Sequence, residues 1–140
     1  MSEAPAVLDE IVLVDDDDAD NYFHRRSIDK VGCAERVRVF EDARECLEYL
    51  SDGSDDGPPA PDLIFLDLNM PGMDGWTFLE RYQKLDGERS ILIVLLTTSV
   101  NADDRARAEQ LEVVSGFETK PLTADRLRAI LERWFADNGR

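Results

Sequence analysis

The sequence predicts an α/β protein, a three-layer α/β/α sandwich built around a five-stranded parallel sheet. Five short runs rich in β-branched or aromatic residues recur along the chain, and segments of helical character separate them. The apolar runs are continuous rather than alternating, which is typical of strands covered on both faces, and right-handed βα crossovers supply the covering helices. At 140 residues the chain has room for one compact domain.

The strands are predicted where short apolar runs follow polar or turn-forming residues. The first run, Ile-Val-Leu-Val, comes directly before four aspartates, and the fifth run is the weakest because it is broken by polar residues and a glycine. The five predicted strands are residues 11–14, 37–40, 63–66, 91–96 and 113–117.

Helices are predicted between and after these runs, and the last has the clearest pattern. Its apolar residues recur at helical spacing and make one stripe, and Thr123 is placed to cap its start. The fourth predicted helix has only a thin apolar face beside several charged residues, so we expect it to pack loosely. The predicted helices are residues 19–31, 43–50, 75–85, 102–111 and 124–135.

The domain is expected to span residues 10–136, with short tails at 1–9 and 137–140. Residues 51–61 have the Gly, Pro, Ser and Asp content of a surface loop, and we interpret them as a long connection. A domain linker is the alternative interpretation. The part that follows would still need the first two strands to complete a sheet, which favours a single domain.

Charge and composition exclude some classes of function. A formal net charge of −15 argues against binding to nucleic acid, where Lys and Arg must face phosphates. Cys33 and Cys46 have no metal-site spacing and are interpreted as reduced thiols, and His24, next to Arg25 and Arg26, is interpreted as a surface residue. The longest apolar run is far too short to cross a membrane, so we expect a soluble, cytoplasmic protein.

Polar residues follow four of the predicted strands, at the edge of the sheet where ligands bind in open parallel sheets. They are the aspartates 15–18, Asp67, Thr97 and Lys120. Carboxylates crowded at one edge repel each other unless a cation neutralises them, and hard oxygen ligands suit Mg²⁺. The alternative is that the four aspartates are a solvated charge run or a helix cap, and we expect Asp17 or Asp18 to cap the first helix.

The segment 67–75, Asp-Leu-Asn-Met-Pro-Gly-Met-Asp-Gly, closely resembles the signature of response-regulator receiver domains, of which the chemotaxis response regulator is the simplest type. The resemblance extends from about residue 11 to 135, and five separated motifs agree with it in order and spacing. It implies a flavodoxin-like (βα)5 fold with strand order 2-1-3-4-5. It also implies that the protein accepts a phosphoryl group as an aspartyl phosphate.

The resemblance assigns a role to each residue that matches a family motif. Asp67 would be the phosphoacceptor, and Mg²⁺ would be bound by Asp15, Asp16, Asp67 and the backbone carbonyl of Asn69. Thr97 would be the switch hydroxyl, Lys120 the lysine that contacts the phosphoryl group, and Pro121 the residue after a cis peptide bond. Phe117 stands where the family has a second switch residue, more often Tyr, although an ordinary core phenylalanine is the alternative.

The implied function is that of a single-domain response regulator in a two-component phosphorelay. A sensor histidine kinase or histidine phosphotransfer protein would phosphorylate Asp67, and the face of the fourth helix, fifth strand and fifth helix would then signal to a downstream protein target. No nucleic acid or membrane partner is expected, and a homodimer through the last helix is one possibility. Two other hypotheses are an aspartate-nucleophile phosphatase and a receiver-like interaction module that is never phosphorylated.

Overall fold

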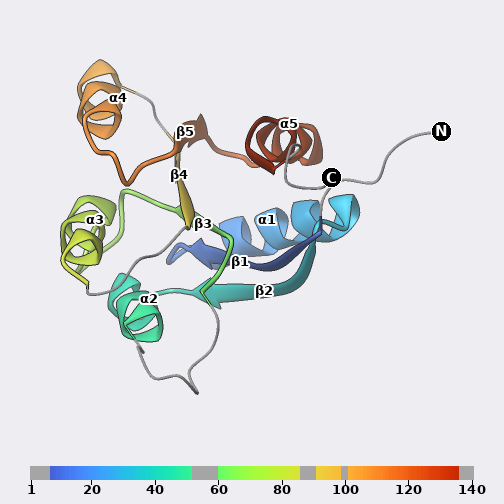
Figure 1. Ribbon diagram of the computed structural model, residues 1–140, viewed down its shortest axis with the longest axis horizontal. Coiled ribbons are helices and arrows are strands. Elements are labelled where there is room, and N and C mark those ends of the chain that lie inside the picture. The colour runs from blue at the N-terminus through green and yellow to red at the C-terminus, as the bar shows by residue number, and fades with distance from the viewer. Residues whose placement is uncertain (1–6, 52–59, 86–90, 99–100, 136–140) are drawn as a thin grey trace.

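The computed structural model describes residues 7–51, 60–85, 91–98 and 101–135, in which strands and helices alternate along the chain (Figure 1). The strands are β1 (Leu8–Val14), β2 (Ala34–Phe40), β3 (Leu63–Leu66), β4 (Leu92–Thr97) and β5 (Gly116–Thr119). The helices are α1 (Asp18–Val31), α2 (Ala43–Leu50), α3 (Gly75–Gln83), α4 (Ala102–Glu109) and α5 (Ala124–Phe135).

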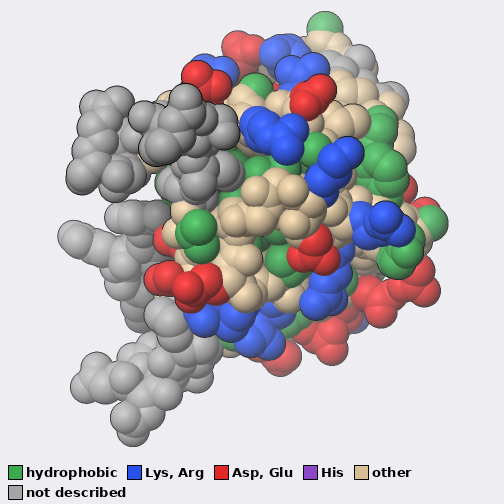
Figure 2. Space-filling view, turned by 90° about the vertical axis from the view of Figure 1, so that its right-hand side faces the viewer, with side chains coloured by type: hydrophobic (Ala, Val, Ile, Leu, Met, Phe, Trp, Pro, Cys, Tyr) green, Lys and Arg blue, Asp and Glu red, His purple; other side chains and the backbone are tan. Residues whose placement is uncertain are grey.

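The strands form one parallel sheet in the order β2-β1-β3-β4-β5. Helices α1 and α5 cover one face of this sheet, and α2, α3 and α4 cover the other (Figure 1). The predicted three-layer sandwich and its strand order are therefore confirmed. Figure 2 views the molecule from the right-hand side of Figure 1, and on this face Lys and Arg side chains lie interspersed with Asp and Glu side chains.

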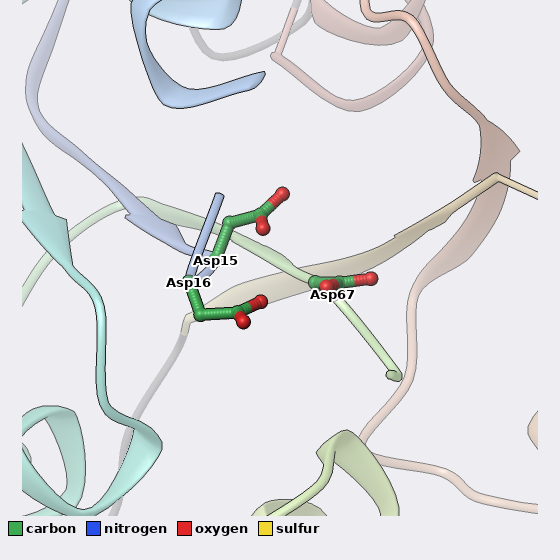
Figure 3. A group of neighbouring side chains, drawn as sticks. All are labelled: Asp15, Asp16 and Asp67. Atoms are coloured by element: carbon green, nitrogen blue, oxygen red, sulfur yellow. The ribbon is translucent and has the colours of Figure 1, made fainter. Parts of the chain in front are cut away.

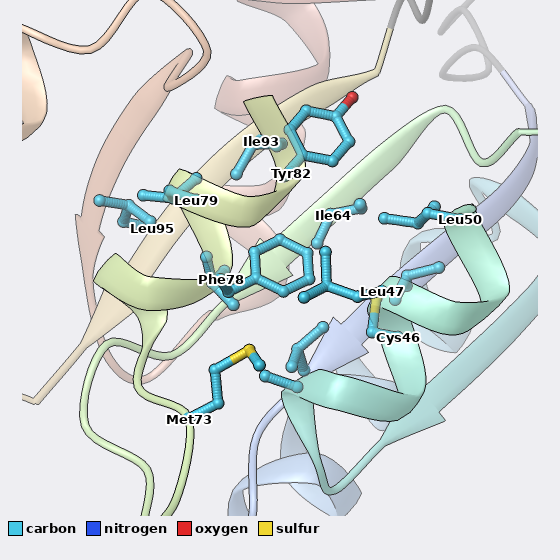
Figure 4. Packing of buried hydrophobic residues seen from close by; sticks show 14 of the residues in the cluster. Cys46, Leu47, Leu50, Ile64, Met73, Phe78, Leu79, Tyr82, Ile93 and Leu95 are labelled. Atoms are coloured by element: carbon cyan, nitrogen blue, oxygen red, sulfur yellow. The ribbon is translucent and has the colours of Figure 1, made fainter. Parts of the chain in front are cut away.

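Each face of the sheet has its own apolar core, because successive residues of a strand point to opposite sides. On β3, Leu63 and Phe65 pack with α1 and α5, whereas Ile64 and Leu66 pack with α2 and α3. Figure 4 shows the second core, in which Phe78 lies fully buried between the helices and the sheet. Burial of both faces of the central strands explains why they read as continuous apolar runs.

The first two strands are longer than predicted because polar residues extend them. β1 begins at Leu8 and includes Glu10, which is buried. The Glu10 carboxylate accepts a hydrogen bond of 2.6 Å from the Tyr49 hydroxyl and one of 3.4 Å from Arg38 Nε. A charged side chain with such partners can be buried within a strand, and apolar periodicity alone does not indicate it.

The fifth strand is displaced from its predicted position of 113–117 and lies at Gly116–Thr119. Val113 and Val114 still pack against the core, but from the loop that precedes the strand. Ser115 begins the pairing, since its N–H donates to the Ile93 carbonyl at 2.8 Å. The β-branched residues therefore correctly indicated which segment packs against the core. They gave the wrong bounds for the strand, which begins three residues later.

Helix ends agree with the expected caps and are shorter than predicted at two places. Asp17 caps α1 by accepting a hydrogen bond from the Asp20 N–H at 3.0 Å, and the Thr123 hydroxyl accepts one from the Arg126 N–H at 3.2 Å. Helices α3 and α4 end two residues early, because Leu85 and Leu111 make tighter i to i−3 hydrogen bonds that close the last turn.

Helix α4 packs loosely, as its composition predicted. Among its residues, all of which are described, only Ala108 is buried. Two of its arginines contact aromatic rings: Arg105 Cζ lies 5.8 Å from the centre of the Phe117 ring, and Arg107 Cζ lies 4.3 Å from that of Trp76. Cation–π contacts of this kind leave the helix accessible to solvent while tying it to α3 and β5.

The prediction that His24 lies on the surface is wrong. His24 is only 2% exposed and lies on the buried face of α1 with Asn21, Ser27 and Ile28. Burial lowers the pKa of His24, because a charged imidazolium is unfavourable there. The helical spacing between His24 and the apolar Ile28 was the signal for this face, whereas the neighbouring arginines point away from it.

Aromatic side chains of α3 and α5 contribute to the two cores. Phe78 is buried and Trp76 is partly buried against the same core; at the end of α5, Phe135 is buried and Trp134 packs beside it. Residues 52–59 of the predicted long connection, residues 1–6 of the predicted N-terminal tail and the whole predicted C-terminal tail, 137–140, lie outside the described residues. Within the described part of the chain, no helix has the length and apolarity to cross a membrane.

Candidate functional site

The predicted site residues meet at the carboxyl edge of the sheet because backbone hydrogen bonds continue past the ends of the strands. The Asp15 N–H donates to the Phe40 carbonyl and the Asp67 N–H to the Val14 carbonyl, both at 3.0 Å. On the other side, the Lys120 N–H donates to the carbonyl of Thr97 at 2.7 Å. The parallel register therefore places residues that are far apart in sequence at one edge.

Three carboxylates lie together at this edge (Figure 3). Asp15 and Asp16 follow β1 and Asp67 follows β3, and each offers an oxygen within 4.8 Å of the oxygens of the other two. Asp15 and Asp67 are buried, whereas Asp16 is exposed to solvent. A group of hard oxygen ligands, partly open to water, fits a divalent cation such as Mg²⁺, which keeps several of its waters.

The environment of Asp67 disfavours its negative charge. Burial is the largest cause and the nearby Asp15 carboxylate the next, and together they raise the pKa of Asp67 to about 6. The Lys120 ammonium and the Asn69 N–H, which donates to Asp67 Oδ1 at 3.4 Å, oppose this effect. Asp67 thus lies in a site that would gain stability from an added cation.

Lys120 brings a positive charge among these carboxylates. Its Nζ lies 2.6 Å from Asp15 Oδ2, 2.8 Å from Asp20 Oδ2 and 3.6 Å from Asp67 Oδ1. Burial alone would lower the pKa of Lys120, but the hydrogen bonds to Asp15 and Asp20, together with the charges of Asp15 and Asp67, raise it. Sequence reasoning missed Asp20, because nothing in the local pattern of α1 indicates a partner one hundred residues away.

The turn from β1 into α1 is held by its own polar side chains. The Asp17 N–H donates to Asp15 Oδ1 at 3.0 Å, and the Asn21 side-chain amide donates to the Asp15 carbonyl at 2.8 Å. Asp17 also caps the helix, as described above. Asp17 therefore has a structural role, and of the four aspartates only Asp15 and Asp16 join Asp67 in the carboxylate group.

The loop after β3 depends on close packing at Gly75, the first residue of α3. A Cβ atom at this position would lie 2.9 Å from the Asp67 carbonyl oxygen and from Leu68 Cα, which is closer than real contacts allow. Asp74 caps the helix by accepting a hydrogen bond of 2.9 Å from the Thr77 N–H. The start of α3 is thus packed directly against the backbone that carries Asp67.

The remaining predicted residues lie at the ends of β4 and β5. Thr97 is the last residue of β4 and is buried, whereas Thr98 next to it is exposed. Phe117 is partly buried on β5 beside Arg105. The peptide bond between Lys120 and Pro121 is cis, as the resemblance implied.

Comparison with known proteins shows similarity over most of the chain. The family model described as "Response regulator receiver domain" matches residues 11–132. A curated relative, the probable methanogenesis regulatory protein FilR2 of Methanothrix harundinacea, is 32% identical over 87% of this chain and 78% of its own length. The cyclic di-GMP phosphodiesterase response regulator RpfG of Xanthomonas campestris is 34% identical over 85% of this chain, but this covers only 30% of RpfG.

Solved structures agree with this similarity. A two-component response regulator from Cytophaga hutchinsonii has a TM-score of 0.81 and 25% identity, covering 91% of this chain and 96% of that one. The Mn(2+)-bound form of response regulator Rcp1, a protein of Synechocystis, has a TM-score of 0.70 and 27% identity, covering 91% of this chain and 94% of that one. The chain belongs to the response regulator receiver domain family of two-component systems.

Proposed function

We propose that the protein accepts a phosphoryl group on Asp67 from a phosphohistidine and passes the signal on through a change in its surface. The observation that carries this proposal is the group of Asp15, Asp16 and Asp67 with the Lys120 ammonium beside it. Receiver domains as a family are signalling phosphoacceptors, and the residues that the chemistry needs are present together in this member.

The proposed step exchanges one bond to phosphorus for another. A carboxylate oxygen of Asp67 attacks the phosphorus atom, the P–N bond to the donor's imidazole breaks, and the departing nitrogen takes a proton from water. Charge builds up on the three phosphoryl oxygens in the transition state, so catalysis depends on positioning and on nearby positive charge. Lys120, 3.6 Å from Asp67 Oδ1, can supply such a charge.

Asp15, Asp16, Asp67 and the backbone carbonyl of Asn69 would hold Mg²⁺. The fit is supported by three carboxylate oxygens within 4.8 Å of one another and by the raised pKa of Asp67, which burial and, secondly, the Asp15 carboxylate cause. When bound, the ion would neutralise charge on the carboxylates and on the phosphoryl oxygens. The Mn(2+)-bound state of the related Rcp1 is consistent with a divalent cation in this family.

Thr97 and the surface beyond it would convert the modification into a signal. In this proposal the Thr97 hydroxyl donates a hydrogen bond to a phosphoryl oxygen, which favours an arrangement already sampled by the protein. Phe117 would follow by steric contact alone, since it lacks the tyrosine hydroxyl. The loose packing of α4, with Ala108 as its buried residue, suits that helix to move.

The proposed partners are a sensor histidine kinase or phosphotransfer protein as donor and a downstream protein as target. For the target we propose the face of α4, β5 and α5, which contains a hollow of about 340 Å³ lined in part by Arg105, Phe117 and Trp134. We also propose the cytoplasm as the location, in keeping with the free, buried thiols of Cys33 and Cys46.

Intact-protein mass after incubation with phosphoramidate tests the proposal. With Mg²⁺ the parent protein should gain one phosphoryl group, and without Mg²⁺ the gain should be strongly reduced. Asp67→Asn, which keeps the side-chain shape but removes the nucleophile, should gain none. A parent protein that stays unmodified with Mg²⁺ would favour an interaction module that is never phosphorylated.

If Thr97 is the switch residue, its removal should leave phosphorylation intact but prevent the conformational response to it. Thr97→Ala should still accept a phosphoryl group, but phosphorylation should no longer change the hydrogen exchange of backbone amides in α4. The parent protein, phosphorylated to the same extent, is the reference. An equal change in exchange in both proteins would contradict the role given to Thr97.

A further inference from the structure

We propose that Asp20 is a positioning residue that holds Lys120 on the α1 side of the site and thereby limits the positive charge available to Asp67. The inference rests on the proposed phosphorylation of Asp67. It begins from the contact between Asp20 Oδ2 and Lys120 Nζ, which at 2.8 Å is a charge-assisted hydrogen bond between side chains one hundred residues apart.

The distances from Lys120 Nζ to the surrounding carboxylates show which of them bind the ammonium most closely. An ammonium group has three N–H donors, and Asp15 and Asp20 accept short hydrogen bonds from it, at 2.6 and 2.8 Å. Asp67 Oδ1, at 3.6 Å, is within ion-pair distance but beyond an ordinary hydrogen bond. In the unphosphorylated protein, Lys120 is therefore bound more closely to the two residues from the β1–α1 segment than to Asp67.

Asp20 lies outside the carboxylate group that fits a cation. That group consists, among the described residues, of Asp15, Asp16 and Asp67. The Asp20 side chain is 35% exposed, whereas that of Lys120 is 8% exposed, so Asp20 reaches the lysine from the outer side of the site. Its negative charge consequently competes with Asp67 for the ammonium instead of contributing to the cation-binding group.

Helix geometry alone does not account for this contact. Acidic residues in the first turn of a helix interact favourably with the helix dipole, and both Asp18 and Asp20 are in the first turn of α1. The Asp20 backbone N–H already donates to Asp17 Oδ1, which fixes the backbone at this position. The described ion pairs of Lys120 include Asp20 and not Asp18, so Asp18 provides a control with the same charge and a similar helical position.

The competition between Asp20 and Asp67 for the Lys120 ammonium should affect the rate of phosphorylation. Transfer brings an anionic phosphoryl group to Asp67, and the charge on its oxygens must be balanced by Lys120. Without the Asp20 charge, the asparagine oxygen of Asp20→Asn can accept only a weaker, neutral hydrogen bond, so Lys120 is held less firmly and can turn toward these oxygens. The substitution also removes a nearby repulsion of the incoming anion. Both effects have the same sign, so Asp20→Asn should accelerate phosphorylation.

The test measures the rate constant for phosphorylation by phosphoramidate in Mg²⁺, from the time course of intact mass, in the parent and in Asp20→Asn, Asp18→Asn and Asp20→Glu. Asp20→Asn should be about two- to fivefold faster than Asp18→Asn, a range that corresponds to a partly exposed ion pair. Asp20→Glu keeps the charge and should return the rate to that of the parent. A loss of structure would slow the reaction and would not be reversed by glutamate.

The outcomes separate this inference from the proposed function. A parent protein that gains no phosphoryl group would overturn the proposed function itself. A parent that is phosphorylated, with Asp20→Asn no faster than Asp18→Asn, would overturn the role of Asp20 alone. The same conclusion would follow if Asp20→Glu were as fast as Asp20→Asn, because the negative charge would then not be the cause.

Discussion

At the scale of single residues, the charged side chain that the proposed chemistry needs, Asp67, makes the folded protein less stable. Asp67 is held in a buried position beside Asp15, where its charged form is unfavourable and its pKa is raised to about 6. A residue selected only for stability would not be ionisable at this position. The unfavourable charge is what a bound cation would relieve, so the same feature that destabilises the free protein would favour binding of Mg²⁺.

Asp67→Asn should therefore stabilise the protein in buffer without Mg²⁺. The raised pKa corresponds to a gain of about 1 to 3 kcal/mol in the free energy of unfolding at neutral pH. Because the folded-state pKa lies above the ordinary value of 3.8, the parent protein recovers this stability as the pH falls through about 6. Urea unfolding between pH 8 and 5 measures the free energy of unfolding of the parent and of Asp67→Asn. A difference between the two that stays constant across this range would contradict the raised pKa of Asp67.

The sequence predicted the main site residues but not their surroundings. Asp15 and Asp67 could be found because each directly follows a predicted strand, and Lys120 because it lies shortly after the fifth; parallel strands bring those positions to one edge. Asp20 could not be found in this way, since its contact with Lys120 depends on how α1 lies over the edge. His24 was assigned to the surface from its charged neighbours, although its helical spacing with Ile28 indicated the buried face.

At the scale of elements, the position of Asp67 depends on how α3 joins the loop after β3. The Gly75 N–H donates to the Leu68 carbonyl at 3.0 Å, and a side chain at Gly75 would collide with the backbone of Asp67 and Leu68. The central strand β3 could be predicted with its bounds because both of its faces are buried. The end of β1 at Val14 could be predicted for the same reason, whereas the polar Asp9 and Glu10 hid its beginning at Leu8. Edge strands could not be bounded as well: β2 carries exposed Glu35 and Arg36, which hid its beginning at Ala34.

Gly75→Ala should lower the free energy of unfolding by about 1 to 3 kcal/mol, because backbone atoms must move to admit the methyl group. It should also slow phosphorylation, since the backbone that moves carries Asp67. Gly116→Ala is the matched control: the added Cβ would lie 3.6 Å from a Val94 methyl group, an ordinary contact. Urea denaturation of the two variants tests this, and equal stabilities would show that the packing at Gly75 is not restrictive.

At the scale of the whole molecule, charge is the dominant property. The chain has 31 acidic and 16 basic residues, which leaves a formal net charge of −15. Basic and acidic side chains lie interspersed on the face that Figure 2 shows. Repulsion among the acidic residues opposes the folded state, and it adds to the local repulsion among the carboxylates at the edge of the sheet.

Salt should consequently stabilise the protein near neutral pH. Raising NaCl from about 0.02 to about 0.5 M shortens the screening length several-fold and should add about 1 kcal/mol, or about 3 to 6 °C in melting temperature. The control is the same series near the isoelectric point, pI ≈ 4.3, where little net repulsion is left to screen. A similar rise in melting temperature with NaCl at both pH values would show that screening of the net charge does not cause the stabilisation.

The most direct test of Asp67 as the phosphoacceptor is to identify the residue that carries the phosphoryl group. After phosphorylation in Mg²⁺, borohydride reduces an aspartyl phosphate to homoserine, which peptide mass spectrometry can assign to one position. We expect homoserine at Asp67, and none there in protein that was not phosphorylated. Homoserine at Asp15, Asp16 or another aspartate instead, or a phosphorylated protein that yields no homoserine, would contradict the assignment of Asp67 as the phosphoacceptor.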